Sequence, residues 1–299
     1  MNTSEMTSTI AKGNGFIAAL DQSGGSTPKA LRAYGVSDEE WDGEEEMYAK
    51  IHEMRSRIVE SPAFNGERVV GAILFERTMD GMIGGKTTPQ ALIDKGVVPF
   101  IKIDKGLEDE ADGVQLMKPI SDLDALLSRS RALGVFGTKE RSVINAANPA
   151  GIAAIVKQQF QIAQQVLSHG MMPILEPEFN IMADDRAAGE ALLRDEILKA
   201  LDGLPEGQQV MLKLSIPVVA GTYDALVAHP KVLKVVALSG GFARDEACER
   251  LAQNHGMIAS FSRALLDSLR AGMSADEFDA SLDEAIAAIH CASTEKVSG

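Results

Sequence analysis

Residues 210 to 215 read V-M-L-K-L-S, a short apolar run with a lysine at position 213. Successive side chains of a β-strand point to opposite faces, which places Met211 and Lys213 on one face and three aliphatic residues on the other. Both faces are mostly apolar, so we expect a strand that is buried on both sides. Burial disfavours the charged form of an amine, which makes Lys213 a candidate for imine formation with a carbonyl substrate. An edge-strand lysine and one half of a buried ion pair are the open alternatives.

Seven further apolar runs resemble this strand, at residues 16–21, 69–75, 98–104, 135–141, 172–178, 234–239 and 257–262. Helical sequence, or a loop long enough to hold a helix, separates each run from the next. This alternation predicts parallel strands with right-handed crossovers, and eight of them predict an α/β fold closed as a (β/α)8 TIM barrel. We expect residues 1–299 to form one barrel domain with a short polar N-terminal leader and a helical C-terminal segment. Length alone also permits two domains.

The composition narrows the classes of partner. The chain has 43 acidic and 29 basic residues and a formal net charge of −14, which argues against nucleic acid or an anionic membrane as the main partner. Its two cysteines make neither a disulfide framework nor a metal cluster. The sequence has no signal-peptide pattern and no run of ~18 apolar residues. We therefore expect a cytoplasmic protein; the oligomeric state stays open, and a homo-oligomer is compatible with the sequence.

Charged side chains gather at the carboxyl ends of the predicted strands, where (β/α)8 enzymes place their active sites. They are Asp21, Lys102, Asp104, Lys139, Arg141, Glu176, Glu178, Lys213 and, just after the eighth strand, Arg263. Charges inside apolar strands are costly unless they are paired, so their recurrence at one end favours catalysis. A layered salt-bridge plug is the structural alternative. It explains a pair or two, but it explains poorly the glycines at the same end.

Two glycine-rich turns lie at these strand ends. Ser239-Gly240-Gly241 follows the seventh strand and, with Arg263, offers backbone N–H groups, close approach without a Cβ and a guanidinium. This combination predicts a phosphate site. The turn S-G-G-S, from Ser23 to Ser26, either holds a second anion or is a plain turn.

Two other patterns point away from nucleotides and metals. D-G-M-I-G-G-K-T at 80–87 nearly matches a P-loop, but Asp80 stands where a glycine is required and Pro89 begins a short helix directly after it. We do not expect nucleotide binding there. The five histidines fall in predicted helices or loops, away from the strand ends, which disfavours a zinc-dependent lyase. We predict a site without a metal or another cofactor.

Several short stretches occur in the order found in class I fructose-bisphosphate aldolases, the Schiff-base-forming family, and the sequence resembles its shorter bacterial members in particular. The stretches are A-A-L-D-Q-S-G-G-S (18–26), F-I-K-I-D-K-G (100–106), K-E-R (139–141), P-I-L-E-P-E (173–178), L-K-L-S-I-P (212–217), L-S-G-G (238–241) and F-S-R-A (261–264). The resemblance implies reversible retro-aldol cleavage of fructose 1,6-bisphosphate to dihydroxyacetone phosphate and glyceraldehyde 3-phosphate, in glycolysis and gluconeogenesis.

The resemblance also implies a role for each matching residue. Lys213 would form the imine, with Glu176 as the general acid and base of that step. Asp21 would help to deprotonate the C4 hydroxyl, Lys139 would assist with charge in the carbinolamine steps, and Glu178 would orient its neighbours. The residues implied for the phosphate on the dihydroxyacetone side are Ser239, Gly240, Gly241 and Arg263. Those implied for the other phosphate are Ser23, Ser26, Lys102 and Arg141.

The sequence departs from the family pattern in three places. Asp21-Gln22-Ser23 replaces the family's Asp-Glu-Ser, and the basic pair of the animal enzymes is reduced to Lys29-Ala30. The C-terminal S-T-E-K-V-S-G lacks the terminal tyrosine of animal members, so tail-assisted proton transfer should be replaced or absent. Alternative functions are a tagatose-bisphosphate or related phosphoketose aldolase, a transaldolase-like enzyme, or a phosphosugar-binding scaffold without turnover.

Overall fold

The computed structural model describes residues 1–297; Ser298 and Gly299, the end of the tail compared above with the animal enzymes, lie outside the described residues. Eight parallel strands follow one another in the order β1-β2-β5-β7-β8-β9-β10-β11. Their bounds are Phe16–Leu20, Val69–Leu74, Val98–Lys102, Gly137–Ile144, Met172–Phe179, Val210–Ser215, Val232–Leu238 and Ile258–Ala259. The Ala19 N–H donates to the Phe261 carbonyl across 3.1 Å, which joins β1 to the chain after β11. The predicted (β/α)8 barrel is confirmed.

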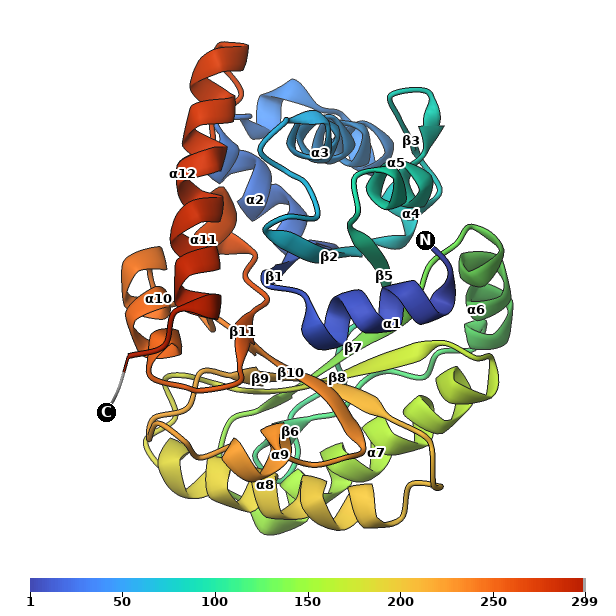
Figure 1. The fold of residues 1–299 in the computed structure, drawn as a ribbon, viewed down its shortest axis with the longest axis vertical. Helices are drawn as coiled ribbons and strands as arrows, with labels where there is room; N and C mark the ends of the chain where they lie inside the picture. The colour runs from blue at the N-terminus through green and yellow to red at the C-terminus, as the bar shows by residue number, and fades with distance from the viewer. Residues whose placement is uncertain (298–299) are drawn as a thin grey trace.

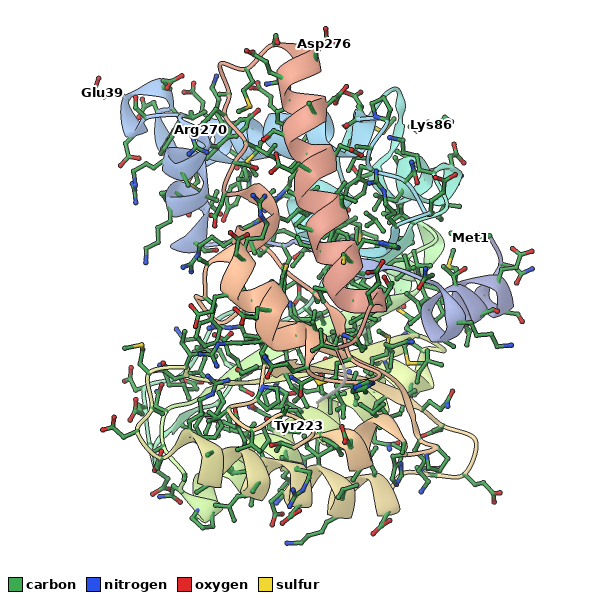
Figure 2. The ribbon with its side chains drawn as sticks, turned by 60° about the vertical axis from the view of Figure 1, so that its left-hand side comes forward. Met1, Glu39, Lys86, Tyr223, Arg270 and Asp276 are labelled. Carbon is green, nitrogen blue, oxygen red and sulfur yellow. The ribbon has the colours of Figure 1, made fainter. Side chains whose placement is uncertain are left out.

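Helices surround these strands (Figure 1). The longer ones are α2 (Ser26–Tyr34), α3 (Gly43–Glu60), α6 (Leu123–Ala132), α7 (Pro149–Ser168), α8 (Arg186–Asp202), α10 (Arg244–Ala252) and α12 (Ala275–Thr294). The shorter ones are η1 (Asp38–Glu40), α4 (Glu76–Met79), α5 (Thr88–Asp94), α9 (Asp224–Val227) and α11 (Arg263–Leu266). Charged residues such as Glu39, Lys86 and Asp276 lie at the periphery (Figure 2). No helix within residues 1–297 has both the length and the apolarity of a membrane span.

The first residues, expected only as a polar leader, form helix α1 (Thr3–Lys12). Asn2 caps this helix: its side chain accepts from the Glu5 N–H, and the Glu5 carboxylate accepts from the Asn2 N–H. Met6 and Ile10 are buried and belong to the apolar cluster inside the barrel. The sequence of α1 is polar on its other faces, which is why its hydropathy did not predict a helix that covers the barrel interior.

Two apolar clusters sandwich the barrel wall. Met211 of β9 belongs to the cluster inside the barrel. Val210, Leu212 and Leu214 belong to the cluster between strands and helices. The alternation predicted for the lysine strand is therefore confirmed, and Lys213, on the Met211 face, points into the barrel with 4% of its surface exposed.

The stretch that nearly matches a P-loop folds as an antiparallel hairpin of β3 (Met82–Ile83) and β4 (Lys86–Thr87). Gly84 and Gly85 have φ angles of +56° and +78°, as the two central positions of a type I′ turn require. The seven-residue helix α5 follows directly. This segment is a hairpin rather than the strand, loop and helix of a nucleotide-phosphate site.

A short strand that the sequence did not predict, β6 (Val114–Gln115), pairs antiparallel with the end of β7.

On β7 itself, Glu140 lies between two residues that face the barrel interior, so its own side chain faces the helices. It is fully buried, and neither carboxyl oxygen has a hydrogen-bond partner among the described residues. Burial, reinforced by the nearby Asp104, raises the pKa of Glu140 well above its ordinary value of 4.5, which favours the protonated form in the folded protein.

We predict that Glu140→Gln stabilises the protein only at higher pH. Below pH 4.5 the group is protonated in both states. Above that pH the unfolded chain releases the proton and the folded protein keeps it, so the parent loses about 1.4 kcal/mol of stability per pH unit until the folded pKa is reached. Urea unfolding at pH 4 and pH 7 should show an advantage for Glu140→Gln that grows with pH. The exposed Glu39→Gln is the control, and an equal advantage at both pH values would contradict the prediction.

Candidate active site

A cavity of about 750 Å³ opens at the carboxyl ends of the strands. All of the predicted catalytic and phosphate-binding residues line it: Asp21, Ser23, Ser26, Lys102, Lys139, Arg141, Glu176, Glu178, Lys213, Ser239, Gly240, Gly241 and Arg263. Their roles stay predictions, but the structure brings them to one place. Six basic and five acidic residues line the cavity, in a chain whose acidic residues outnumber its basic ones by 43 to 29. Positive charge is therefore concentrated here relative to the rest of the molecule.

Lys139, on β7, is the hub of the buried charges. Its Nζ lies 2.7 Å from Asp21 Oδ2, 2.9 Å from Glu176 Oε2 and 3.9 Å from Asp104 Oδ2. All four side chains are nearly inaccessible to solvent. The contact with Glu176 is an ion pair without the alignment of a hydrogen bond, since Glu176 Oε2 has no hydrogen-bond partner among the described residues.

Glu176 bridges two ammonium groups. Its other oxygen, Oε1, lies 2.9 Å from Lys213 Nζ. The carboxylate on β8 thus touches both the candidate nucleophile on β9 and Lys139 on β7. A carboxylate beside a buried amine can accept the proton that the amine must lose before it attacks a carbonyl carbon, and can later return it to a leaving hydroxyl.

The shifts in pKa follow from these contacts. Burial alone would raise the pKa of Asp21, but Lys139 and Lys213 outweigh it and hold the pKa far below the ordinary range. Glu176 is lowered in pKa for the same reason, by the same two lysines against its own burial. Burial would lower the pKa of Lys139, but Asp21, Glu176 and Asp104 raise it above its ordinary value. At neutral pH the centre therefore holds two carboxylates and a permanently charged ammonium.

Two of the basic residues expected near a phosphate already have carboxylate partners. Lys102 Nζ lies 2.7 Å from Asp104 Oδ1, and Arg141 Nε donates to Glu178 Oε2 at 2.5 Å. Burial alone would lower the pKa of Arg141, but the Glu178 carboxylate outweighs burial and raises this pKa above its ordinary value. These pairs fix the two cations in place beside the centre.

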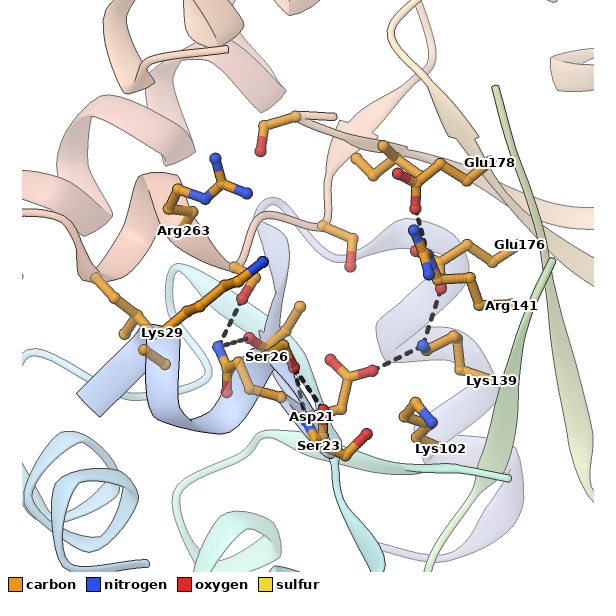
Figure 3. Close-up of a pocket in the computed structure, with 18 of the residues that line it drawn as sticks. Asp21, Ser23, Ser26, Lys29, Lys102, Lys139, Arg141, Glu176, Glu178 and Arg263 are labelled. Carbon is orange, nitrogen blue, oxygen red and sulfur yellow. Dashed lines mark hydrogen bonds and ion pairs between the residues drawn. The ribbon is translucent and has the colours of Figure 1, made fainter. Parts of the chain in front are cut away.

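Two other cations of the cavity are not paired in this way. The ion pairs of the cavity use Lys102, Lys139, Arg141 and Lys213, which leaves Lys29 and Arg263 as its unpaired cations among the described residues. Figure 3 shows both of them across the cavity from Glu176 and Glu178. Lys29 was noted in the sequence only as the remnant of a basic pair, and the structure adds it to the cavity lining.

The two glycine-rich turns differ in their local structure. Gly240 and Gly241 have φ angles of +63° and +122°, and a Cβ on Gly240 would lie 2.5 Å from Ile181 Cγ2, so this turn requires glycine. In the other turn, Ser26 Oγ accepts from the Ser23 N–H at 2.9 Å and donates to the Ser23 carbonyl at 2.8 Å. Ser26 thus closes its own turn, at the start of α2, and leaves the Ser23 hydroxyl to face the cavity.

Sequence reasoning missed Ser260, which also lines the cavity. Its Oγ is buried and has no hydrogen-bond partner among the described residues, so it is available to a ligand. The signal was present: Ser260 is two residues after Ile258, which faces the barrel interior. None of the five histidines is among the residues that line this cavity. Within residues 1–297, no three His, Cys, Asp or Glu side chains are grouped as a metal site.

We predict that Lys139→Met destabilises the protein by about 3–5 kcal/mol, because it leaves the buried carboxylates of Asp21 and Glu176 with one ammonium fewer. Asp21→Asn in the same chain should recover part of the loss, since it removes the carboxylate that was paired with Lys139, whereas Glu176 keeps its contact with Lys213. Chemical denaturation of the single and double variants measures both effects. The exposed Lys118→Met should change stability by less than about 0.5 kcal/mol. Fully additive losses in the double variant would show that the pairing does not hold the centre together.

The chain is similar to known proteins in sequence and in fold. A family model for class-I fructose-bisphosphate aldolase matches residues 3–216. The fructose-bisphosphate aldolase of Plasmodium falciparum, solved in a ternary complex with TRAP and a small-molecule inhibitor, has a TM-score of 0.76 at 20% identity, over 99% of this chain and 96% of that one. The protein Cgl0159 of Corynebacterium glutamicum has a TM-score of 0.55 at 13% identity, over 97% and 92% of the two chains.

At these identities the two structures support the fold, and the family rests on the sequence match. That match runs from the first helix through the lysine strand and covers well over half of the residues. The chain therefore belongs to the class-I fructose-bisphosphate aldolase family.

Proposed function

We propose that this aldolase cleaves fructose 1,6-bisphosphate reversibly into dihydroxyacetone phosphate and glyceraldehyde 3-phosphate through an imine on Lys213. The observation that carries the proposal is the buried pair of Lys213 and Glu176. Lys213 Nζ lies 2.9 Å from Glu176 Oε1, in a cavity that two glycine-rich turns also line. A nucleophilic amine, a proton carrier beside it and candidate sites for two phosphates are what this reaction needs.

Imine formation uses the first pair. Glu176 takes a proton from the Lys213 ammonium, and the free amine attacks the C2 carbonyl carbon of the open-chain ketose. The carbinolamine then loses its hydroxyl as water, with the proton returned by Glu176, and leaves a cationic imine. Lys139, fixed 2.9 Å from Glu176 Oε2, stabilises the carboxylate each time it gives up the proton.

Carbon–carbon cleavage uses Asp21. Its carboxylate accepts the proton of the C4 hydroxyl; the C3–C4 bond breaks, C4 becomes the aldehyde of glyceraldehyde 3-phosphate, and the bonding electrons move into the imine to form an enamine. Protonation of the enamine at C3 and hydrolysis of the imine then release dihydroxyacetone phosphate and restore Lys213. Because the imine nitrogen receives the electrons, no free carbanion forms.

The two phosphates of the substrate would bind at opposite ends of the cavity. We assign the phosphate of the dihydroxyacetone half to Ser239, Gly240, Gly241 and Arg263, and the other phosphate to Ser23, Ser26, Lys102 and Arg141. Lys29 adds an unpaired ammonium on the Arg263 side, whereas Lys102 and Arg141 would bring their carboxylate partners with them. Glu178 would keep Arg141 oriented. A cytoplasmic location and a role in glycolysis and gluconeogenesis follow from the proposed substrate.

We expect borohydride treatment with dihydroxyacetone phosphate to leave a reduced adduct on Lys213, located by mass spectrometry, and none in Lys213→Met. An adduct on Lys102 or Lys139 would move the chemistry to another strand. A parent protein that stays unmodified, cleaves fructose 1,6-bisphosphate and loses activity to a chelator would overturn the mechanism. Turnover of tagatose 1,6-bisphosphate or of a transaldolase substrate in preference to fructose 1,6-bisphosphate would replace the proposed substrate. Binding without turnover would leave a phosphosugar-binding scaffold.

Asp21→Asn should separate the two halves of the reaction. Borohydride should still trap dihydroxyacetone phosphate on Lys213, because imine formation depends on Glu176. Cleavage of fructose 1,6-bisphosphate should fall by about 10²–10⁴-fold, the usual cost of removing a general base. Steady-state cleavage rates and trapping yields measure the two halves. Equal loss of both would place Asp21 in imine formation instead.

A further inference from the structure

Arg55 of α3 is a buried arginine behind the active-site cavity. It is fully inaccessible to solvent, and none of its contacts within residues 1–297 is an ion pair. Its Nη2 donates to the Gln22 carbonyl at 2.6 Å and to Gln22 Oε1 at 3.0 Å, and its Nη1 donates to Thr78 Oγ1 at 2.6 Å. Burial lowers the pKa of Arg55 to about 10, with Asp21 the main charge that opposes this. Burying a cation costs free energy, and two of the three hydrogen bonds that Arg55 donates go to a single loop residue, Gln22.

Gln22 connects Arg55 to a second loop. Its Nε2 donates to Ser262 Oγ at 2.6 Å and approaches the Ala19 carbonyl at 3.3 Å. Gln22 and Ser262 are 240 residues apart in the chain and lie on the two loops that follow β1 and β11. Gln22 and Ser262 line the cavity themselves, and so do the residues that follow them, Ser23 and Arg263. The amide side chain of Gln22 therefore links the loop after β1 to the loop after β11, and both loops face the cavity.

We propose that Arg55 is a positioning residue that, through Gln22 and Ser262, fixes the distance between the two phosphate sites and so selects sugar bisphosphates over monophosphates. This inference rests on the proposed function, which assigns Arg263 to one phosphate and Ser23 to the other. A bisphosphate must meet both segments at once, so its affinity depends on their separation. A ketose 1-phosphate needs only the segment of Arg263, and its affinity depends little on the tie.

The tie contains Arg55, Gln22 and Ser262, and its last two members can be replaced with different structural costs. Ser262 is partly exposed on a loop and itself lines the cavity, so Ser262→Ala removes the Gln22 hydrogen bond and one hydroxyl of the cavity lining. Gln22→Leu removes the same bond and also the one that Gln22 Oε1 accepts from Arg55, and it leaves the bond from Arg55 to the Gln22 backbone carbonyl in place. Thr78→Val is the matched control, because it removes the third hydrogen bond of Arg55 and leaves the tie intact.

The test measures Kd by calorimetry for two uncleavable ligands, hexitol 1,6-bisphosphate and hexitol 1-phosphate, alongside the rate at which the parent cleaves fructose 1,6-bisphosphate. We expect Ser262→Ala to weaken bisphosphate binding about fivefold, the worth of one hydrogen bond, and monophosphate binding less than twofold. Gln22→Leu combined with Ser262→Ala should cost no more than Gln22→Leu alone. Thr78→Val should lower stability and leave the ratio of the two Kd values unchanged.

Three outcomes would overturn the inference: equal weakening of both ligands by Ser262→Ala, additive effects in the double variant, or a Thr78→Val protein whose Kd ratio shifts as much as that of Ser262→Ala. Failure of the proposed function looks different, because the parent would then bind the bisphosphate without cleaving fructose 1,6-bisphosphate. A parent that binds neither hexitol phosphate would overturn both.

Discussion

The buried ammonium of Lys139 is the interaction on which the rest of the site depends. Burying such a charge is costly unless it is paired, and its three carboxylate neighbours come from strand ends on either side of β7. Asp21 follows β1, Asp104 follows β5 and Glu176 lies on β8. The pairs form only when these strands meet in one barrel with one register, so the charge cluster both depends on the closed fold and specifies it.

The barrel wall separates two tasks. Apolar residues fill its lower interior and the space under the helices, which supplies the burial that folds the chain. The charged residues lie nearer the carboxyl ends of the strands, where the side chains that face the interior line the cavity. On β9 a single step of two residues, from Met211 to Lys213, crosses from one level to the other. Lys139, Glu176 and Lys213 thus lie on strands, and Asp21 and Asp104 lie just after strand ends.

The sequence could predict what alternation and strand order control. All eight strands, the face of Lys213 and the strand-end residues that meet in the cavity follow from apolar periodicity and from the rule that parallel strands end at one edge. It could not predict α1, because only Met6 and Ile10 of that helix are buried apolar residues and the remainder reads as a polar leader. The role of Arg55 was also hidden, since a charged residue within a charged helix predicts exposure until the β1 loop is placed against it.

The pairing of charges within the cavity was harder still to predict, because the sequence does not show which basic side chains lie next to a carboxylate. In the structure, four of the six cations touch carboxylates, and Lys29 and Arg263 do not. A paired cation has its charge offset before a ligand arrives, so it suits the steps in which protons move between fixed neighbours. An unpaired cation at the rim gains its first strong partner when an anion enters. The same net-acidic chain can therefore keep a reactive, internally neutralised centre and still attract a phosphorylated sugar to its edge.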